Sequence, residues 1–149
     1  CQPCPRGYYG MTSAISNQCQ KCPAGQYQDE LGSSTCILCP PGFFSGFPGS
    51  PQCSACPAGT YSEASGQTKC TPCIGGTFAS SSGSSSCSKC GSTHFTYTGG
   101  STSCTPCPNN TRTISDRADG INKCVCAFGT YDVLGRAGHP CFPCPHGAY

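Results

Sequence analysis

Pairs of cysteines recur along the chain at a nearly constant step, and this feature limits the fold more than any other. The first cysteine of successive Cys-x-x-Cys pairs recurs every 17 residues, at Cys19, Cys36, Cys53, Cys70, Cys87 and Cys104. A fixed step this short is typical of a linear array of small units that contact their neighbours, and not of a single globular core. We therefore expect a tandem array whose units begin at these cysteines.

Each unit repeats one pattern of residues between its cysteines. In the central unit, Cys56 is followed by Pro57, Gly59, the aromatic Tyr61 and a second glycine, Gly66, before the next Cys-x-x-Cys pair. A proline that presets φ, followed two residues later by a glycine that can adopt a positive φ, predicts a tight turn. Because glycine or proline interrupts every short stretch, we expect short extended pairs and no helix.

The composition predicts a small disulfide-rich fold. The 149 residues include 18 cysteines, one methionine and no tryptophan, so no sizeable apolar core can form and each unit needs a covalent link. We expect a mostly irregular, elongated array with short β-structure, built of about nine units of ~17 residues. The expected units are residues 1–18, 19–35, 36–52, 53–69, 70–86, 87–103, the divergent 104–123, 124–140 and the truncated 141–149.

The pattern weakens between Cys90 and Cys124. Thr93 and Asn110 stand where the turn glycine is expected, and Arg112 stands at the aromatic position. Asparagine tolerates a positive φ better than most residues, so Asn110 is a mild departure. The loop that follows it is longer than the others, which predicts an exposed segment.

The repeated cysteines have three possible roles, which are zinc binding, redox catalysis and structural disulfides. Repeated Cys-x-x-Cys pairs can bind zinc, but the nine pairs, eight of them Cys-x-x-Cys and one Cys124-Val125-Cys126, do not group into fours. A thioredoxin-like redox role needs a βαβ unit, of which the sequence has no sign. Structural disulfides are the remaining chemistry, and they predict an oxidising compartment. Such an array should be rigid when oxidised and unfolded when reduced.

The connectivity leaves two alternatives. The favoured one forms a disulfide between the second cysteine of each pair and the first cysteine of the next pair. It leaves Cys1 and Cys144 for partners outside these residues. In this arrangement neighbouring units are connected only by the two residues inside each pair. The competitor joins first to first and second to second, as in Cys19–Cys36 with Cys22–Cys39. The favoured disulfides are Cys4–Cys19, Cys22–Cys36, Cys39–Cys53, Cys56–Cys70, Cys73–Cys87, Cys90–Cys104, Cys107–Cys124 and Cys126–Cys141. In that arrangement the recurring aromatics should pack beside disulfides of adjacent units, namely Tyr27, Phe44, Tyr61 and Phe78.

Few other residues predict a functional site. Asn109 begins the sequon Asn109-Asn110-Thr111 and is a candidate N-glycan carrier. The serines of 80–86 are candidate O-glycan acceptors or a flexible loop. The three histidines, His94, His139 and His146, have no metal-ligand spacing. We identify no catalytic or metal residues and expect neither enzyme activity nor a cofactor.

The run Cys-Pro-x-Gly-x-[Tyr/Phe], followed by Gly-x-x-x-Cys-x-x-Cys, resembles the ephrin-receptor-like cysteine-rich repeat. It is also similar to the single-disulfide modules of tumour-necrosis-factor receptors. The resemblance is closest from Cys19 to Cys87 and weaker where Thr93 and Arg112 depart from the pattern. It implies an extracellular, disulfide-bonded module. Similar arrays occur in large secreted proteins of protists and algae, including those of flagellar hairs (mastigonemes).

From these features we expect a structural segment of a glycosylated extracellular rod or filament, secreted or at the cell surface. Its partners would be glycans and other chains or further repeats of the same protein, in a homo-oligomeric filament. The alternative is a spacer or ligand-binding region of a cell-surface receptor ectodomain. A formal net charge of +2 without a basic run argues against nucleic acid as a partner. No apolar run is long enough to span a membrane.

Overall fold

The computed structural model describes residues 2–10, 18–133, 135 and 137–144. Within these ranges regular structure is limited to strands of two or three residues and one turn of 3-10 helix, η1 (Ile121–Lys123). The strands are β1 (Tyr8–Tyr9), β2 (Gln20–Lys21), β3 (Gln26–Tyr27), β4 (Ile37–Leu38), β5 (Phe43–Phe44), β6 (Ser54–Ala55), β7 (Thr60–Tyr61), β8 (Thr71–Pro72), β9 (Thr77–Phe78), β10 (Ser88–Lys89), β11 (His94–Phe95), β12 (Thr105–Pro106), β13 (Thr111–Thr113), β14 (Cys124–Cys126), β15 (Thr130–Tyr131) and β16 (Phe142–Pro143).

Each odd-numbered strand pairs with the next strand in a two-stranded antiparallel sheet. In the hairpin of β13 and β14, η1 lies between the two strands in the sequence. The second strand of most hairpins is the dipeptide inside a Cys-x-x-Cys pair, so that Tyr27 lies opposite Ile37 and Gln26 opposite Leu38. The expected short extended pairs are therefore present. The aromatic position ends the first strand of each hairpin with two-residue strands, and Tyr27, Phe44 and Phe78 are half-buried there. Their packing against neighbouring disulfides stays a prediction.

A four-residue turn leads into the first strand of each hairpin. The amide of Gln26 donates to the carbonyl of Pro23 at 3.1 Å, and Gly25 at the third turn position has φ 84°. This geometry is that of a type II turn, which needs a positive φ at its third position. The proline occupies the first position of the turn and contributes only the carbonyl oxygen that accepts the turn hydrogen bond, so the turn does not use its fixed φ. Ile74 can therefore replace it, since the carbonyl of Ile74 accepts from Thr77 at 3.1 Å.

Among the described residues, eight disulfides close eight consecutive loops, with Cα–Cα separations of 5.5 to 5.8 Å that are usual for disulfides. Every one joins the second cysteine of a pair to the first cysteine of the next, so the competing pairing of Cys22 with Cys39 does not occur. Cys1 lies outside the described residues. The loops are loop 1 (Cys4–Cys19), loop 2 (Cys22–Cys36), loop 3 (Cys39–Cys53), loop 4 (Cys56–Cys70), loop 5 (Cys73–Cys87), loop 6 (Cys90–Cys104), loop 7 (Cys107–Cys124) and loop 8 (Cys126–Cys141).

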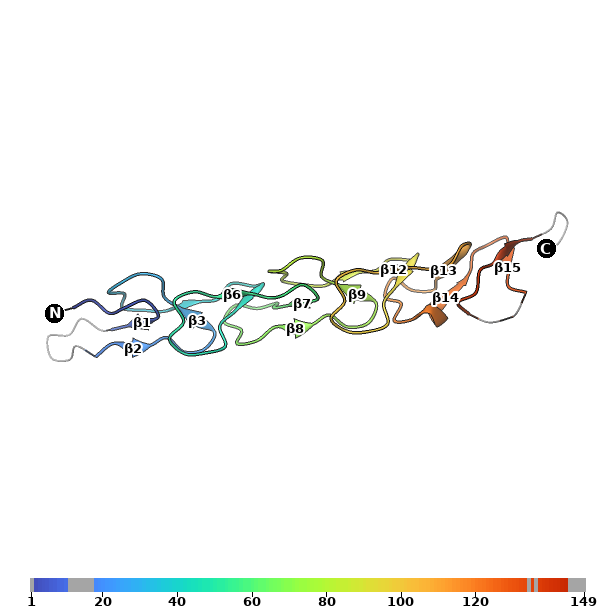
Figure 1. Ribbon diagram of the computed structural model, residues 1–149. Coiled ribbons are helices and arrows are strands. Elements are labelled where there is room, and N and C mark those ends of the chain that lie inside the picture. The colour runs from blue at the N-terminus through green and yellow to red at the C-terminus, as the bar shows by residue number, and fades with distance from the viewer. Residues whose placement is uncertain (1, 11–17, 134, 136, 145–149) are drawn as a thin grey trace. The chain divides into compact units, whose positions relative to one another are not determined.

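The chain divides into two compact units. Unit 1 comprises Cys1–Thr71 and Ser81–Ser86, and unit 2 comprises Pro72–Ser80 and Cys87–Tyr149. Unit 1 thus holds loops 1 to 4 together with the tip of loop 5. Within unit 1 the hairpins follow one another in chain order, as the labels β1, β2, β3, β6 and β7 show in Figure 1.

Consecutive loops of unit 1 are joined by backbone hydrogen bonds, which corrects the expectation that only the residues inside each cysteine pair would join them. The amide of Gly25 in loop 2 donates to the carbonyl of Ser45 in loop 3 at 2.8 Å. The amide of Gly49 in loop 3 donates back to the carbonyl of Cys22 in loop 2, also at 2.8 Å. Two loops that lie side by side satisfy each other's turn amides in this way, because the hairpins are too short to use them.

Loops two places apart also meet, at the glycines. We call the glycine three residues after the second cysteine of a pair the turn glycine, and the one ten residues after it the distal glycine. A Cβ built on the turn glycine Gly25 would lie 2.1 Å from the carbonyl oxygen of the distal glycine Gly66, and one on Gly42 would lie 2.2 Å from that of Gly83. The turn glycine is therefore required both for its positive φ and for this close approach.

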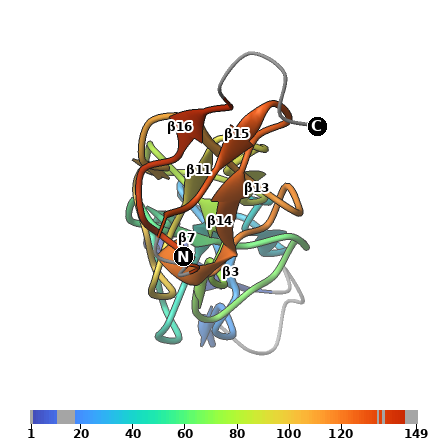
Figure 2. The same cartoon turned by 90° about the vertical axis from the view of Figure 1, so that its right-hand side faces the viewer.

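Unit 2 departs from the regular pattern at loop 7. Its hairpin, β13 with β14, is three residues long, and Figure 2 shows the two strands beside each other. Between them the longer loop makes the 3-10 turn η1; the described residues contain no α-helix, and the rest of their regular structure is the short β-structure that was expected. Asn110 has φ 62°, as expected for an asparagine at the turn-glycine position.

Candidate functional site

Sixteen of the cysteines predicted as site residues are joined in structural disulfides, and some of them lie in the interior. Cys22, Cys39, Cys56 and Cys73 are fully buried. Their sulfurs are bonded to carbon and to another sulfur, so they are not thiolates and cannot ligate zinc. Within the part of the chain that the structure describes, no group of three or more His, Cys, Asp or Glu side chains could hold a metal ion. Cys144 is an exposed free thiol.

Loop 7 contains the apolar cluster of unit 2. Phe95, Ala118 and Cys124 are each at most 2% exposed, and Cys107 and Ile121 pack against them. The amide of Thr96 donates to the carbonyl of Ala118 at 3.1 Å, which ties the extra residues of loop 7 to β11. The lengthened loop is exposed at residues 114–117 and 119, as expected, but it also buries Ala118, which packs in one cluster with Phe95 of loop 6.

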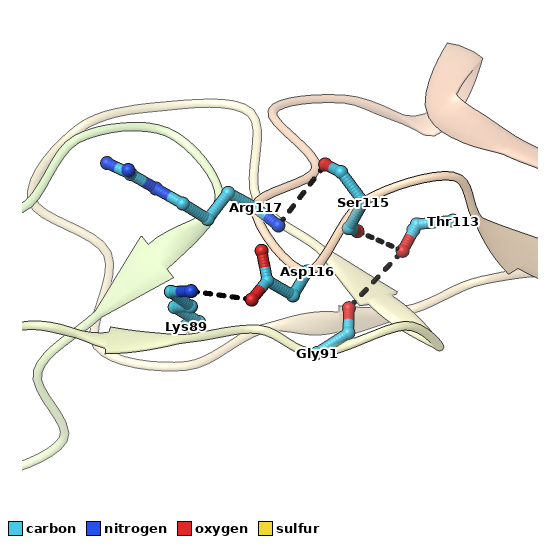
Figure 3. Close-up of polar contacts among 6 residues, drawn as sticks. All are labelled: Lys89, Gly91, Thr113, Ser115, Asp116 and Arg117. Atoms are coloured by element: carbon cyan, nitrogen blue, oxygen red, sulfur yellow. Dashed lines mark hydrogen bonds and ion pairs between the residues drawn. The ribbon is translucent and has the colours of Figure 1, made fainter.

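Polar contacts also join loop 7 to Gly91 of loop 6 and to Lys89, which lies just before that loop (Figure 3). The Lys89 ammonium donates to the Asp116 carboxylate at 2.6 Å, and the amide of Gly91 donates to the backbone carbonyl of Asp116 at 3.1 Å. The hydroxyl of Thr113 lies within hydrogen-bond distance of the carbonyls of Gly91 and Ser115. Sequence reasoning missed these residues, because Lys89 and Asp116 are 27 positions apart and belong to no motif.

The Lys89 ammonium lowers the pKa of Asp116 below its ordinary value, chiefly through the hydrogen bond. A carboxylate whose pKa is lower in the folded state stabilises that state above its unfolded pKa, and this contribution is lost as the pH falls through the folded pKa. Both side chains are more than half exposed, so the contribution is small and weakens with salt.

Replacement of Asp116 by asparagine should remove an acid-dependent part of the local stability of unit 2. In the wild type we expect hydrogen-exchange protection of the Gly91 amide, corrected for intrinsic rates, to fall below about pH 4. In Asp116→Asn this protection should be lower at pH 7 and should lose that pH dependence, while Asp119→Asn serves as the control. An unchanged acid transition in Asp116→Asn would assign it to another carboxylate.

Asn109, the candidate glycan carrier, lies in the turn at the start of the loop 7 hairpin and is exposed. Its backbone carbonyl accepts from Cys141 at 3.2 Å. The neighbouring Asn110 side chain donates to the carbonyl of Cys141 at 2.8 Å, and the Thr111 hydroxyl donates to that of Pro108 at 2.6 Å. The sequon is thus held in a fixed turn whose first residue faces solvent, with room for a bulky group.

We predict that Asn109 carries an N-glycan in protein from its natural source or from a secretory host. Glycosidase treatment should convert Asn109 to Asp, with the corresponding mass change in the peptide that contains it. Asn109→Gln should remove the modification and leave the eight disulfides unchanged, because the side chain is exposed. Recovery of only unmodified Asn109 from the natural source would contradict this assignment.

The remaining candidates do not come together. His94 contacts the hydroxyl of its neighbour Thr93 at 2.9 Å, and His139 lies in loop 8, whereas His146 falls outside the described residues. Between Ser80 and Ser86, the Ser84 hydroxyl donates to the carbonyl of Ser81 at 2.8 Å, so part of this serine run forms a turn. O-glycosylation of these serines stays a prediction.

Aromatic residues of loop 8 and of the strand after it, β16, form a further feature that sequence reasoning missed. Phe128 is 91% exposed, and the Arg112 guanidinium lies 4.5 Å from the centre of its ring. Tyr131 and Phe142 are cross-strand partners whose ring centres are 6.5 Å apart. Arg112 stands at the aromatic position of loop 7, and there its guanidinium makes a cation–π contact with the ring of Phe128.

Comparison with known proteins places these loops in a family. The family model described as tyrosine-protein kinase ephrin type A/B receptor-like matches the chain four times, at residues 10–52, 42–90, 59–103 and 76–124. The matches together extend over residues 10–124, which is more than half of the chain. The chain belongs to this family. The predicted resemblance is therefore confirmed, and loop 7 is included in the last match despite its departures.

Thyroglobulin of Mus musculus and thyroglobulin of Rattus norvegicus are each 45% identical to the chain over 42 residues. These 42 residues are 28% of this chain and 1% of each thyroglobulin. The ephrin-receptor-like repeats, the disulfides and this partial similarity together indicate an extracellular or secreted protein with a cysteine-rich repeat region. Among the described residues no helix is long and apolar enough to cross a membrane.

Proposed function

We propose that this ephrin-receptor-like array is a structural segment of a glycosylated extracellular rod or filament. The observation that carries the proposal is the repeated contact between loops of unit 1. Each loop donates backbone hydrogen bonds to the next loop and back to the previous one, and the turn glycine of a loop lies against the distal glycine two loops further on. Contacts of this kind can be repeated without limit by adding equal loops, which is the property that a fibrous protein needs.

The chemistry of the loops supports a mechanical role. The interlocking contacts use backbone groups and glycines, so their strength does not depend on pH or on charged side chains. The disulfides resist extension, because separating the ends of a closed loop would require breaking a covalent bond. No nucleophile, base or metal centre enters this proposal.

A second function, as a spacer or ligand-binding part of a receptor ectodomain, is favoured by the description of the family itself, which names ephrin receptors. Here the same array would hold a binding domain away from the cell surface. The two functions differ in the fraction of the natural source that contains the protein and in the reagent that extracts it from that fraction.

Extraction from the natural source distinguishes them. With antibodies against the array, we expect the protein in extracellular material that resists mild detergent and is released by reductant or denaturant. A matched cytosolic marker and a membrane-anchored marker define the other fractions. Release of the intact protein by detergent alone, together with the membrane marker, would reject the filament and support the receptor.

A further inference from the structure

The disulfides that close the loops differ in how far they are shielded from solvent. In loops 2 to 5 the cysteine that begins the loop is 0% exposed, while the cysteine that ends it is half-buried. In loops 7 and 8 the buried cysteine is the one that ends the loop, Cys124 at 1% and Cys141 at 4% exposure. Each of these six disulfides therefore has one cysteine that solvent does not reach.

The Cys90–Cys104 disulfide of loop 6 is different, because both of its cysteines are only half-buried. It has the same sequence separation of 14 as Cys73–Cys87 in the same unit, and the Cα–Cα distances are 5.6 and 5.8 Å. Loop size therefore does not distinguish the two. The disulfide of loop 1 also has two half-buried cysteines, but residues 11–17 of that loop lie outside the described ranges, and no conclusion is drawn for it.

The distal glycine of the following loop accounts for the burial of Cys73. The amide of Gly100, the distal glycine of loop 6, donates to the carbonyl of Cys73 at 2.7 Å. A Cβ built on Gly99 would lie 2.9 Å from the same carbonyl oxygen, so the backbone of loop 6 lies directly on Cys73. The distal glycines of loops 3, 4 and 5 donate in the same way to the carbonyls of Cys22, Cys39 and Cys56.

Loop 7 contacts loop 6 differently, because Arg117 stands at its distal position. The φ of Arg117 is not in the positive region that the distal glycines occupy, and its amide donates to the Ser115 hydroxyl at 3.3 Å. Loop 7 is bonded instead to the residue after Cys90, since the amide of Gly91 donates to the carbonyl of Asp116 at 3.1 Å. Loops 2 to 4 have proline at the Gly91 position, which has no amide to donate. The contact is thus displaced by one residue, and Cys90 is left partly exposed.

We propose that the Cys90–Cys104 disulfide is a site of thiol–disulfide exchange with low-molecular-weight thiols, and that it is reduced before the disulfides of loops 2–5, 7 and 8. The thiolate of such a thiol bonds to one sulfur of the disulfide while the bond between the two sulfurs breaks, and the other cysteine leaves as a thiolate. A second thiol then displaces the first from the mixed disulfide. Two thiols are oxidised to one disulfide, and their two protons end on the two cysteines. A buried disulfide reacts only after its loop has opened, which slows the attack.

The other contacts of loop 6 suit a reversible reduction. Phe95 is 2% exposed and packs with Ala118 and Cys124 of loop 7. The amide of Thr96 donates to the carbonyl of Ala118 at 3.1 Å. While the disulfides of the neighbouring loops are intact, these contacts keep the two thiols near each other, so the disulfide can form again. The exchange site goes beyond the proposed function, because it would serve a rod segment and a receptor spacer alike.

Peptide mapping with two alkylating reagents tests the inference on the oxidised 149-residue chain. Free thiols are first blocked with N-ethylmaleimide, reduced glutathione is added under native conditions, and the new thiols are labelled with iodoacetamide. We expect the cysteines of Cys90–Cys104 to be labelled at least about tenfold faster than those of Cys73–Cys87, the matched disulfide of the same unit. In denaturant this difference should disappear, because the burial of Cys73 is lost.

Gly49→Ala tests the cause of the protection. Gly49 has φ +85° and donates to the carbonyl of Cys22, and a Cβ there would meet only the Lys21 side chain, at 3.4 Å. The strained φ should loosen this contact and raise the labelling rate of Cys22–Cys36 at least about fivefold, without changing that of Cys90–Cys104 in the other unit. Intact mass before reduction establishes that the variant retains its disulfides.

Equal labelling rates of Cys90–Cys104 and Cys73–Cys87 in the native protein would overturn the inference. A difference that persists unchanged in denaturant would overturn it too, since it would assign the reactivity to the local sequence and not to burial. An unchanged rate for Cys22–Cys36 in a folded Gly49→Ala variant would contradict the protective role of the distal glycine. The native and denatured comparison uses the unaltered chain, so it decides the inference even if the variant misfolds.

Discussion

Reduction of the disulfides is expected to unfold the whole chain. Each hairpin has only two or three residues per strand, and the largest apolar cluster of unit 2 contains three buried residues. Closing a loop of about 15 residues stabilises a fold by roughly 3 kcal/mol through the entropy of the unfolded chain. Units of this size bury too little apolar surface to replace that contribution.

Circular dichroism and hydrogen exchange, with and without reductant under non-denaturing conditions, measure this effect. The oxidised protein should protect the amides that join loops, such as that of Gly49, and the reduced protein should lose this protection everywhere. Alkylation of Cys144 without reductant is the control, because it modifies a thiol and leaves the eight disulfides in place. A reduced protein that keeps its protected amides would show that the loop-to-loop hydrogen bonds suffice.

Replacement of the turn glycine Gly42 by alanine should have the largest effect of any single conservative substitution in unit 1. Its φ of +86° costs an L-residue about 1–2 kcal/mol. In addition, the Cβ would lie 2.2 Å from the carbonyl oxygen of Gly83, so one backbone segment must move, and overpacking of this kind costs a further ~1–3 kcal/mol.

Gly129→Ala is the matched control, since Gly129 occupies the same turn position with φ +79° but has open space around it. The difference between the two variants isolates the contact between loops two places apart. Hydrogen exchange of the Gly83 amide, which donates to Cys56 at 2.8 Å, is the appropriate readout because an array need not unfold in one step. Gly42→Ala should reduce its protection at least about tenfold. Equal losses of amide protection, measured around residue 42 in Gly42→Ala and around residue 129 in Gly129→Ala, would mean that only the φ requirement matters.

Much of the local structure was predictable because the covalent pattern is local. Cysteines spaced 14 residues apart, as in Cys22–Cys36, can close only small loops, and the glycine between them supplies the positive φ that a type II turn needs. The positive φ of Asn110 followed from the tolerance of asparagine for that region. These features depend on residues within one repeat, so a single sequence contains the information.

Only the tertiary structure determined how the loops are joined. The hydrogen bonds from Gly25 to Ser45 and from Gly49 to Cys22 use backbone groups, which every residue carries, so the sequence alone does not indicate their partners. The covering of Phe95 by Ala118 likewise depends on how two loops come together, and a small residue in a lengthened loop carries no signal of it. The sequence by itself therefore determined the closed loops and their turns, whereas the packing of backbone against backbone decided how each loop is covered by those that follow.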